Sequence, residues 1–109
     1  MTSFEELAQA SFQIIAHVGD ARSCYLEAIS RANSGDYDGA TKLMERGAEM
    51  FRKGHAAHAG LVQREAGGDP VSMTLMITHA EDQLMSAEAF GILAEKFIDV
   101  YRRMDGIDR

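Results

Sequence analysis

The sequence predicts an all-α protein in which three long helices run up, down and up in one antiparallel bundle. Two clusters of helix-breaking residues divide the 109-residue chain. They read Asn-Ser-Gly-Asp at 33–36 and Gly-Gly-Asp-Pro at 67–70. In each of the three parts, apolar or small residues recur at the three- and four-residue spacing of a helix face. A chain of this length fits one domain, so we expect residues 1–109 to fold as a unit.

The breakers also predict where the helices begin and end. We expect helices at about 3–33, 37–66 and 70–104. Asp36 is a suitable N-cap for the second helix, because its carboxylate can accept a hydrogen bond from a backbone N–H of the first turn. Asp69 followed by Pro70 is predicted to begin the third helix, since proline is favoured at the first helical position. Gly67 or Gly68 can adopt the left-handed conformation that ends the second helix.

The first and third expected helices each carry two neighbouring stripes of mainly apolar residues. On the third helix, the first stripe comprises Leu75, Thr78, Asp82, Met85, Ala89 and Ile92. The second comprises Met76, His79, Gln83, Ser86, Phe90, Leu93, Phe97 and Val100. A three-helix monomer needs one wide stripe per helix. The additional stripes therefore predict self-association, with a fully packed monomer core as the alternative.

The composition excludes several classes of function. A net charge of −6 disfavours nucleic-acid binding through phosphate contacts. A single cysteine, Cys24, cannot form an internal disulfide, which is typical of a reducing compartment. No basic segment precedes an apolar one at the start of the chain, and no segment has the length and apolarity of a membrane span. We therefore expect a cytoplasmic protein that is not inserted in a membrane.

The most distinctive polar residues lie on the third expected helix. His79 and Asp82 are three residues apart, and His79 and Gln83 are four apart, so these side chains share one helical face. Polar groups on an otherwise apolar face are costly unless they are hydrogen-bonded or functional. The spacing therefore leaves two interpretations, a reactive histidine or a local His79–Asp82 hydrogen bond.

Two further histidines, His55 and His58, are spaced so that they could hold a metal ion together. Two ligands do not complete a site, and the sequence offers no cysteine or carboxylate cluster beside them. We expect two partly exposed histidines without a metal.

The segment 79–87, His-Ala-Glu-Asp-Gln-Leu-Met-Ser-Ala, resembles the active-site helix of the lactose/cellobiose-type enzyme IIA proteins of the bacterial sugar phosphotransferase system. The family pattern is close to His-Ala-Gln-Asp-His-Leu-Met-x-Ala, and the likeness extends over essentially the whole chain. Glu81 stands in place of the usual Gln, and Gln83 in place of the usual second His. His58-Ala59 stands where the family tends to have Gln-Thr.

This resemblance implies a homotrimer of three-helix subunits with phosphocarrier function. His79 would accept a phosphoryl group from the phosphocarrier protein HPr and pass it to a cysteine of the IIB component. Asp82 would lie on the trimer axis and bind a divalent cation, for which Mg²⁺ is the expected ion. Gln83, Ser86 and Thr78 could donate hydrogen bonds to the phosphoryl group, with Thr78 belonging to a neighbouring subunit.

The transported sugar would be a disaccharide, with cellobiose, diacetylchitobiose and lactose left open. The alternative is a non-catalytic helical adaptor or assembly module, in which His79 and Asp82 form a polar layer that fixes the register of the bundle.

Overall fold

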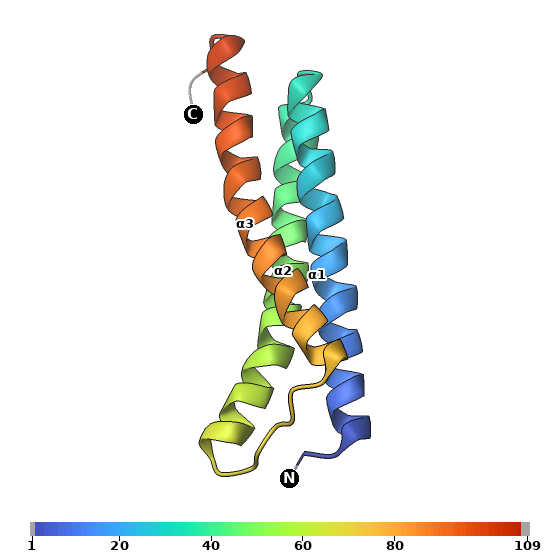
Figure 1. Cartoon of the computed structure of the whole chain (residues 1–109). Coiled ribbons are helices and arrows are strands. Elements are labelled where there is room, and N and C mark those ends of the chain that lie inside the picture. The colour runs from blue at the N-terminus through green and yellow to red at the C-terminus, as the bar shows by residue number, and fades with distance from the viewer. Residues whose placement is uncertain (1, 108–109) are drawn as a thin grey trace.

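Three antiparallel helices of 30 residues each make up the molecule, as the sequence predicts (Figure 1). The computed structural model describes residues 2–107. The helices are α1 (Phe4–Asn33), α2 (Tyr37–Ala66) and α3 (Leu75–Met104). They form a rod of 56 × 20 × 18 Å. The α1–α2 turn and the end of α3 lie at one end of the rod, and the α2–α3 connection lies at the other (Figure 1). No described helix is both long and apolar enough to cross a membrane.

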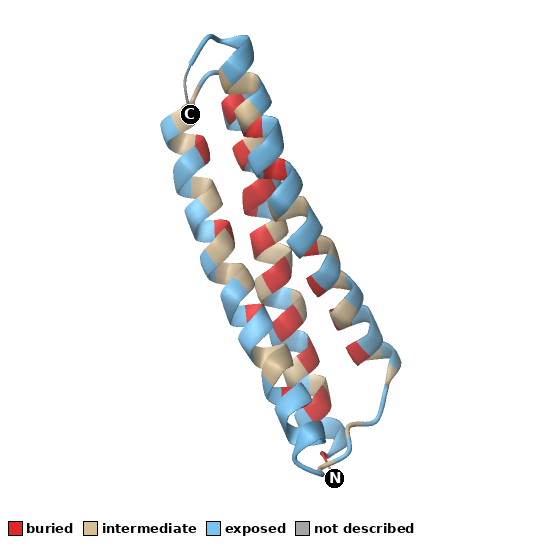
Figure 2. Ribbon diagram, turned by 90° about the vertical axis from the view of Figure 1, so that its left-hand side faces the viewer, coloured by how far each residue is buried: buried red, intermediate tan, exposed pale blue. Residues whose placement is uncertain are grey.

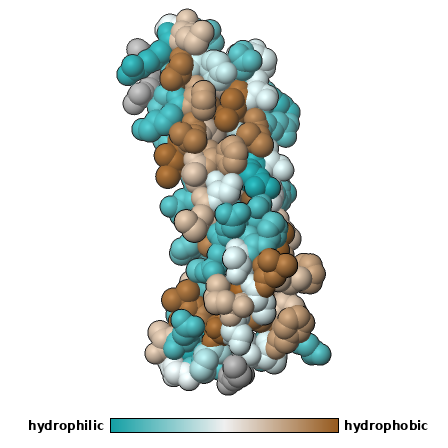
Figure 3. All heavy atoms as spheres, in the orientation of Figure 1, coloured by the Kyte–Doolittle hydropathy of each residue, from teal (hydrophilic) through white to brown (hydrophobic). Residues whose placement is uncertain are grey.

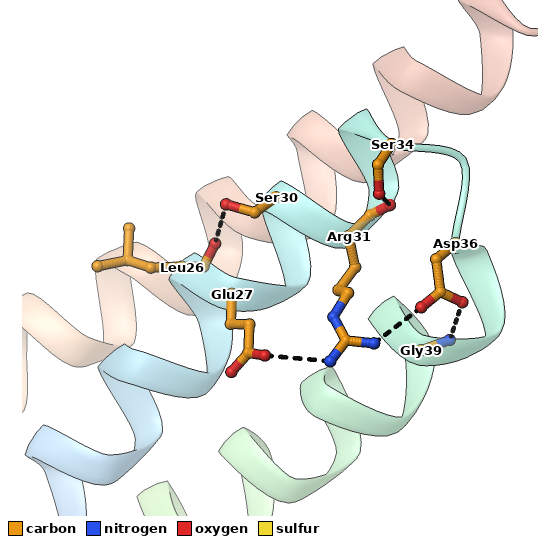
Figure 4. Close-up of polar contacts among 7 residues, drawn as sticks. All are labelled: Leu26, Glu27, Ser30, Arg31, Ser34, Asp36 and Gly39. Atoms are coloured by element: carbon orange, nitrogen blue, oxygen red, sulfur yellow. Dashed lines mark hydrogen bonds and ion pairs between the residues drawn. The ribbon is translucent and has the colours of Figure 1, made fainter.

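The turn between α1 and α2 is held by the predicted cap. The Asp36 carboxylate accepts a hydrogen bond from the Gly39 backbone N–H at 2.9 Å, and the Arg31 guanidinium donates another at 2.9 Å (Figure 4). These two hydrogen bonds hold the pKa of Asp36 below its ordinary value. Gly35 turns the chain with a φ of 89°. Gly68 has a φ of 94°, which confirms the left-handed residue predicted at the end of α2.

The predicted start of α3 at Asp69-Pro70 is wrong. The helix begins at Leu75, and Thr74 is its N-cap, whose hydroxyl accepts a hydrogen bond from the Ile77 N–H at 3.2 Å. The preceding segment is held outside the helix, because the Pro70 carbonyl accepts a hydrogen bond from the Thr2 N–H at 3.2 Å and Val71 packs against the core. The connection between α2 and α3 is therefore longer than a tight turn.

Glycines allow α1 and α2 to approach closely. A Cβ added at Gly47 would lie 2.5 Å from the ring of Tyr25, and one added at Gly54 would lie 2.6 Å from Val18. At both positions, a side chain of α1 therefore packs directly against the backbone of α2. Ion pairs at the surface also join these two helices, Arg46–Asp20 at 3.0 Å and Arg64–Glu6 at 2.8 Å.

The core face of α3 is a stripe that the sequence did not single out. Its buried residues are Ile77, Ala80, Leu84, Ala87, Ala94 and Ile98. One predicted stripe of α3 lies to the side of this face and the other lies opposite it, so neither supplies the core face of the helix. The self-association that these stripes predict stays a prediction. On α1 one of the two expected stripes is buried apart from Phe4, which is 72% exposed. Its buried members are Leu7, Ser11, Ile14, Val18, Ala21, Tyr25 and Ala28. Figure 2 shows the buried residues along the inner sides of the helices.

A large apolar surface of α3 consequently faces away from the bundle. We call it the outer face of α3, and it comprises Leu75, Met85, Ile92, Leu93, Phe97 and Val100, all exposed. The space-filling view shows hydrophobic residues in two patches, separated by hydrophilic residues near the middle of the rod (Figure 3). Exposed apolar patches of this kind on a small protein mark places where another surface packs.

Candidate functional site

His79 lies on the second turn of α3, exposed, at the edge of an apolar hollow. The hollow has a volume of about 560 Å³ and lies between the beginnings of α1 and α3. Its other lining residues are Phe4, Ile15, Thr74, Leu75 and Met76. Phe4 and Ile15 belong to α1, so their place beside His79 depends on how α1 and α3 pack. An accessible imidazole with an apolar rim can react with a partner while water is partly excluded.

The other predicted site residues surround His79 on the same helix. Asp82 is exposed, whereas Gln83 and Ser86 are half-buried. At about 100° per residue, Gln83 and Ser86 lie on the same side of α3 as His79. The hydroxyl of Thr78 donates a hydrogen bond to the Thr74 carbonyl at 2.9 Å, so it must rotate before it can donate to another group.

The local hydrogen bond between His79 and Asp82 is not formed. Within residues 2–107, neither side chain takes part in a hydrogen bond or an ion pair. Asp82 is thus an unpaired carboxylate on the side of α3 that faces away from the core.

The other histidines have different surroundings. His58 Nε2 lies 2.7 Å from Glu81 Oε2, which joins α2 to α3. The ring of His55 contacts that of Phe51, with 6.1 Å between the ring centroids. His17 is half-buried on α1. The sequence identified His58 and Glu81 only as separate departures from a family pattern, because their contact depends on the register between two helices.

One chain does not contain a complete metal site in its described part. No group of three or more His, Cys, Asp or Glu side chains among residues 2–107 is arranged to hold an ion. The carboxylate oxygens of Asp82 suit a hard cation such as Mg²⁺, but a single carboxylate does not complete its coordination shell. Asp82 therefore fits a cation site only if further chains supply the other ligands.

Comparison with known proteins agrees with the resemblance seen in the sequence. The family model for the lactose/cellobiose-specific IIA subunit of the PTS system matches residues 9–102. The chain belongs to this IIA family. The lichenan-specific phosphotransferase enzyme IIA component of Bacillus subtilis is 42% identical over 100 residues, which cover 92% of this chain and 91% of the relative. The lactose-specific EIIA component of Staphylococcus aureus is 34% identical and covers 91% of this chain and 96% of its own.

A solved structure shows the same fold. The crystal structure of the PTS cellobiose-specific enzyme IIA from Bacillus anthracis has a TM-score of 0.89 to this IIA chain at 33% identity. The likeness covers 97% of this chain and 95% of the other. Since IIA components of this system are phosphotransfer proteins, this IIA chain has a phosphotransfer role in sugar uptake, and His79 lies within the matched residues.

Proposed function

We propose that the protein accepts a phosphoryl group from HPr on His79 and passes it to a cysteine of the IIB component. The observation that carries this proposal is the environment of His79 compared with that of the other histidines. His79 is exposed beside an apolar hollow, whereas His58 is hydrogen-bonded to Glu81 and His55 contacts Phe51. His79 is thus the imidazole best placed to meet a docked partner.

The chemistry needs two exchanges at phosphorus. A nitrogen of neutral His79 attacks the phosphoryl group of phospho-HPr; the N–P bond of HPr breaks as the new N–P bond forms. The thiolate of IIB then attacks the same phosphorus, and the His79 N–P bond breaks. Such transfers depend on alignment and charge stabilisation. Gln83 and Ser86 lie on the side of α3 from which they can donate hydrogen bonds to the phosphoryl oxygens, and Thr78 of a neighbouring subunit can add a third.

The outer face of α3 supports assembly into a homotrimer. Leu75 is 88% exposed and Met85 is 73% exposed, values that a second protein surface would reduce. Three copies packed through α3 would bury this face, because each helix can present its outer side to the common axis. The apolar rim beside His79 would then lie near a boundary between subunits.

The same assembly would bring three Asp82 carboxylates together, and we propose that they hold a divalent cation, Mg²⁺. Like charges at short range repel, and a cation offsets that repulsion. Asp82→Leu should therefore give a trimer that melts no lower than wild type and no longer responds to EDTA or Mg²⁺, since apolar atoms can replace a buried charged cluster without loss. A wild-type melting temperature that EDTA and Mg²⁺ leave unchanged would contradict the cation site.

These proposals place the protein in the cytoplasm, where it works in the uptake of a disaccharide such as cellobiose, diacetylchitobiose or lactose. The relatives named above for lactose and cellobiose support that substrate class. A IIA component need not touch the sugar itself, so the IIB and membrane components would select it.

Phosphoryl transfer from phosphoenolpyruvate tests the function. Incubation with enzyme I and HPr should label the wild type, and the label should be stable to base and labile to acid, as for phosphohistidine. His79→Ala should stay folded and take up no label. An unlabelled wild type would favour the alternative, a helical adaptor in which His79 and Asp82 serve as a polar layer.

A further inference from the structure

Two departures from the family pattern form one contact in this chain. Glu81 of α3 stands where the family has Gln, and His58 of α2 stands where it tends to have Gln. His58 Nε2 lies 2.7 Å from Glu81 Oε2. The side chain of His58 is only 22% exposed and that of Glu81 37%, so the hydrogen bond is partly shielded from water. The two residues together therefore form a polar contact between α2 and α3 in this chain.

This hydrogen bond lies on the turn of α3 that carries His79. Two residues along a helix correspond to a rotation of about 200°. His79 and Glu81 therefore project from opposite flanks of α3, and the buried residues Ile77, Ala80 and Leu84 lie between them against the core. A rotation of α3 that moved Glu81 would move His79 by the same angle.

In this part of α3, the larger core residues Ile77 and Leu84 alternate with two alanines that resist such a rotation less. Ala80 and Ala87 are fully buried, and a methyl group interlocks less deeply than a larger side chain. Residues 69–74 before the helix are not helical, so they do not continue α3 towards α2. The α3 helix also packs less extensively on α2 than on α1.

His58, in contrast, belongs to a helix that is firmly placed. The backbone of α2 contacts α1 directly at Gly47 and Gly54, where even a Cβ would collide with Tyr25 or Val18. The α1–α2 pair thus provides a fixed frame, and the hydrogen bond to Glu81 ties α3 to it.

We propose that the His58–Glu81 hydrogen bond fixes the rotation of α3 and so positions the His79 imidazole for phosphoryl transfer. This inference rests on the function proposed above. His58 and Glu81 are positioning residues, since neither contacts the reacting atoms. In-line transfer is sensitive to small displacements, and a misplacement of about 1 Å can lower a rate about a hundredfold.

Three variants test the role of this hydrogen bond in phosphoryl transfer. His58→Ala removes it, and the double variant His58→Gln with Glu81→Gln restores a polar contact of the family's kind. Arg46→Gln is the matched control, because it breaks a 3.0 Å ion pair between α1 and α2 away from His79. His58→Ala should lower the maximal rate of phosphorylation by phospho-HPr about tenfold to a hundredfold, without a change in KM. The double variant should recover most of that rate, and Arg46→Gln should retain it.

Two further measurements separate positioning from a loss of stability. The melting temperature and the assembled mass of His58→Ala should remain close to those of wild type. The NMR signals of the His79 ring should shift in His58→Ala and stay in place in Arg46→Gln.

The proposal is overturned if His58→Ala transfers at the wild-type rate, if its rate falls only in step with its melting temperature, or if the double variant is not rescued. Unchanged His79 signals in His58→Ala would overturn the coupling between the two residues even where transfer was slowed. A wild type that accepts no phosphoryl group would overturn the proposed function itself, while the His79 signals would still report whether His58 sets the orientation of the ring.

Discussion

The α1–α2 pair and α3 are built on different principles. In the α1–α2 pair, glycines on one helix receive Tyr25 and Val18 from the other, and ion pairs flank the contact. The core face of α3 is largely alanine and isoleucine, and its outer face exposes large apolar side chains. The α1–α2 contact buries its apolar residues within one chain. The outer face of α3 stays exposed in a single chain.

The proposed chemistry therefore lies on the helix whose apolar side chains are least covered by the rest of the chain. The histidine lies on α3, beside the hollow that α3 shares with the start of α1. A phosphocarrier must meet two partners in turn, and an exposed helix on a rigid pair of helices allows that. We therefore expect substitutions in α3 to change assembly and transfer, and substitutions between α1 and α2 to change stability.

The largest expected effect is on assembly. Leu93→Glu would place a charge on the outer face of α3 in every copy, and burying that charge is costly. Sedimentation equilibrium should show the wild type at three times the mass of the 12.0 kDa chain and the variant as a monomer. Val62→Glu is the matched control, because Val62 on α2 is 54% exposed and Leu93 52%. A monomeric wild type would contradict the trimer.

The next effect concerns the glycine contact of the α1–α2 pair. Gly54→Ala places a methyl group 2.6 Å from Val18, which should lower the free energy of unfolding by about 1–3 kcal/mol. Gly60→Ala is the control: a Cβ there meets nothing within 4 Å, so alanine should raise stability by about 0.5–1 kcal/mol. Thermal melts at one protein concentration compare them. Equal melting temperatures for the two variants would show that the helices are not in close contact at Gly54.

The smallest effect is the pH dependence of one surface ion pair. The hydrogen bond from Arg64, with further hydrogen bonds from Ser3, lowers the pKa of Glu6 from 4.5 to about 2. Because the folded-state pKa is depressed, this stabilisation is present above pH 4.5 and is lost as the pH falls towards 2. Glu6→Gln should melt slightly below wild type at neutral pH and equally at the acid end. Since Glu6 is exposed, the difference should also shrink with added salt.

The sequence was sufficient to predict the three helices and the core face of α1, but not the start or the core face of α3. Gly35, Asp36 and Gly68 act through local backbone conformation, so their roles could be read from neighbouring residues. The start of α3 could not, because Thr2 and Val71 hold the segment after Pro70 through contacts with distant parts of the chain. Helix-capping preferences depend only on neighbouring residues, and they favour Asp69-Pro70. They do not include the long-range contacts that keep this segment out of the helix.

The site was predictable to a similar degree. The motif around His79 predicted the family, which the comparison confirms, whereas His79 as the phosphoryl acceptor stays a prediction. The packing of Phe4 beside His79 and the hydrogen bond between His58 and Glu81 depend on the register between helices, which periodicity does not specify. The buried stripe of α3 was also missed. Because Ala80 and Ala87 are small, the larger apolar residues of the outer face dominated the hydrophobic periodicity of this helix.

The most direct test of the account is to locate the phosphoryl group on the wild-type protein. Phosphorylation through enzyme I and HPr, followed by phosphorus–nitrogen NMR correlation or peptide sequencing under alkaline conditions, identifies the modified histidine. The account predicts phosphohistidine at His79 alone, with His17, His55 and His58 unmodified. Phosphorylation at any of those three instead of His79 would contradict it.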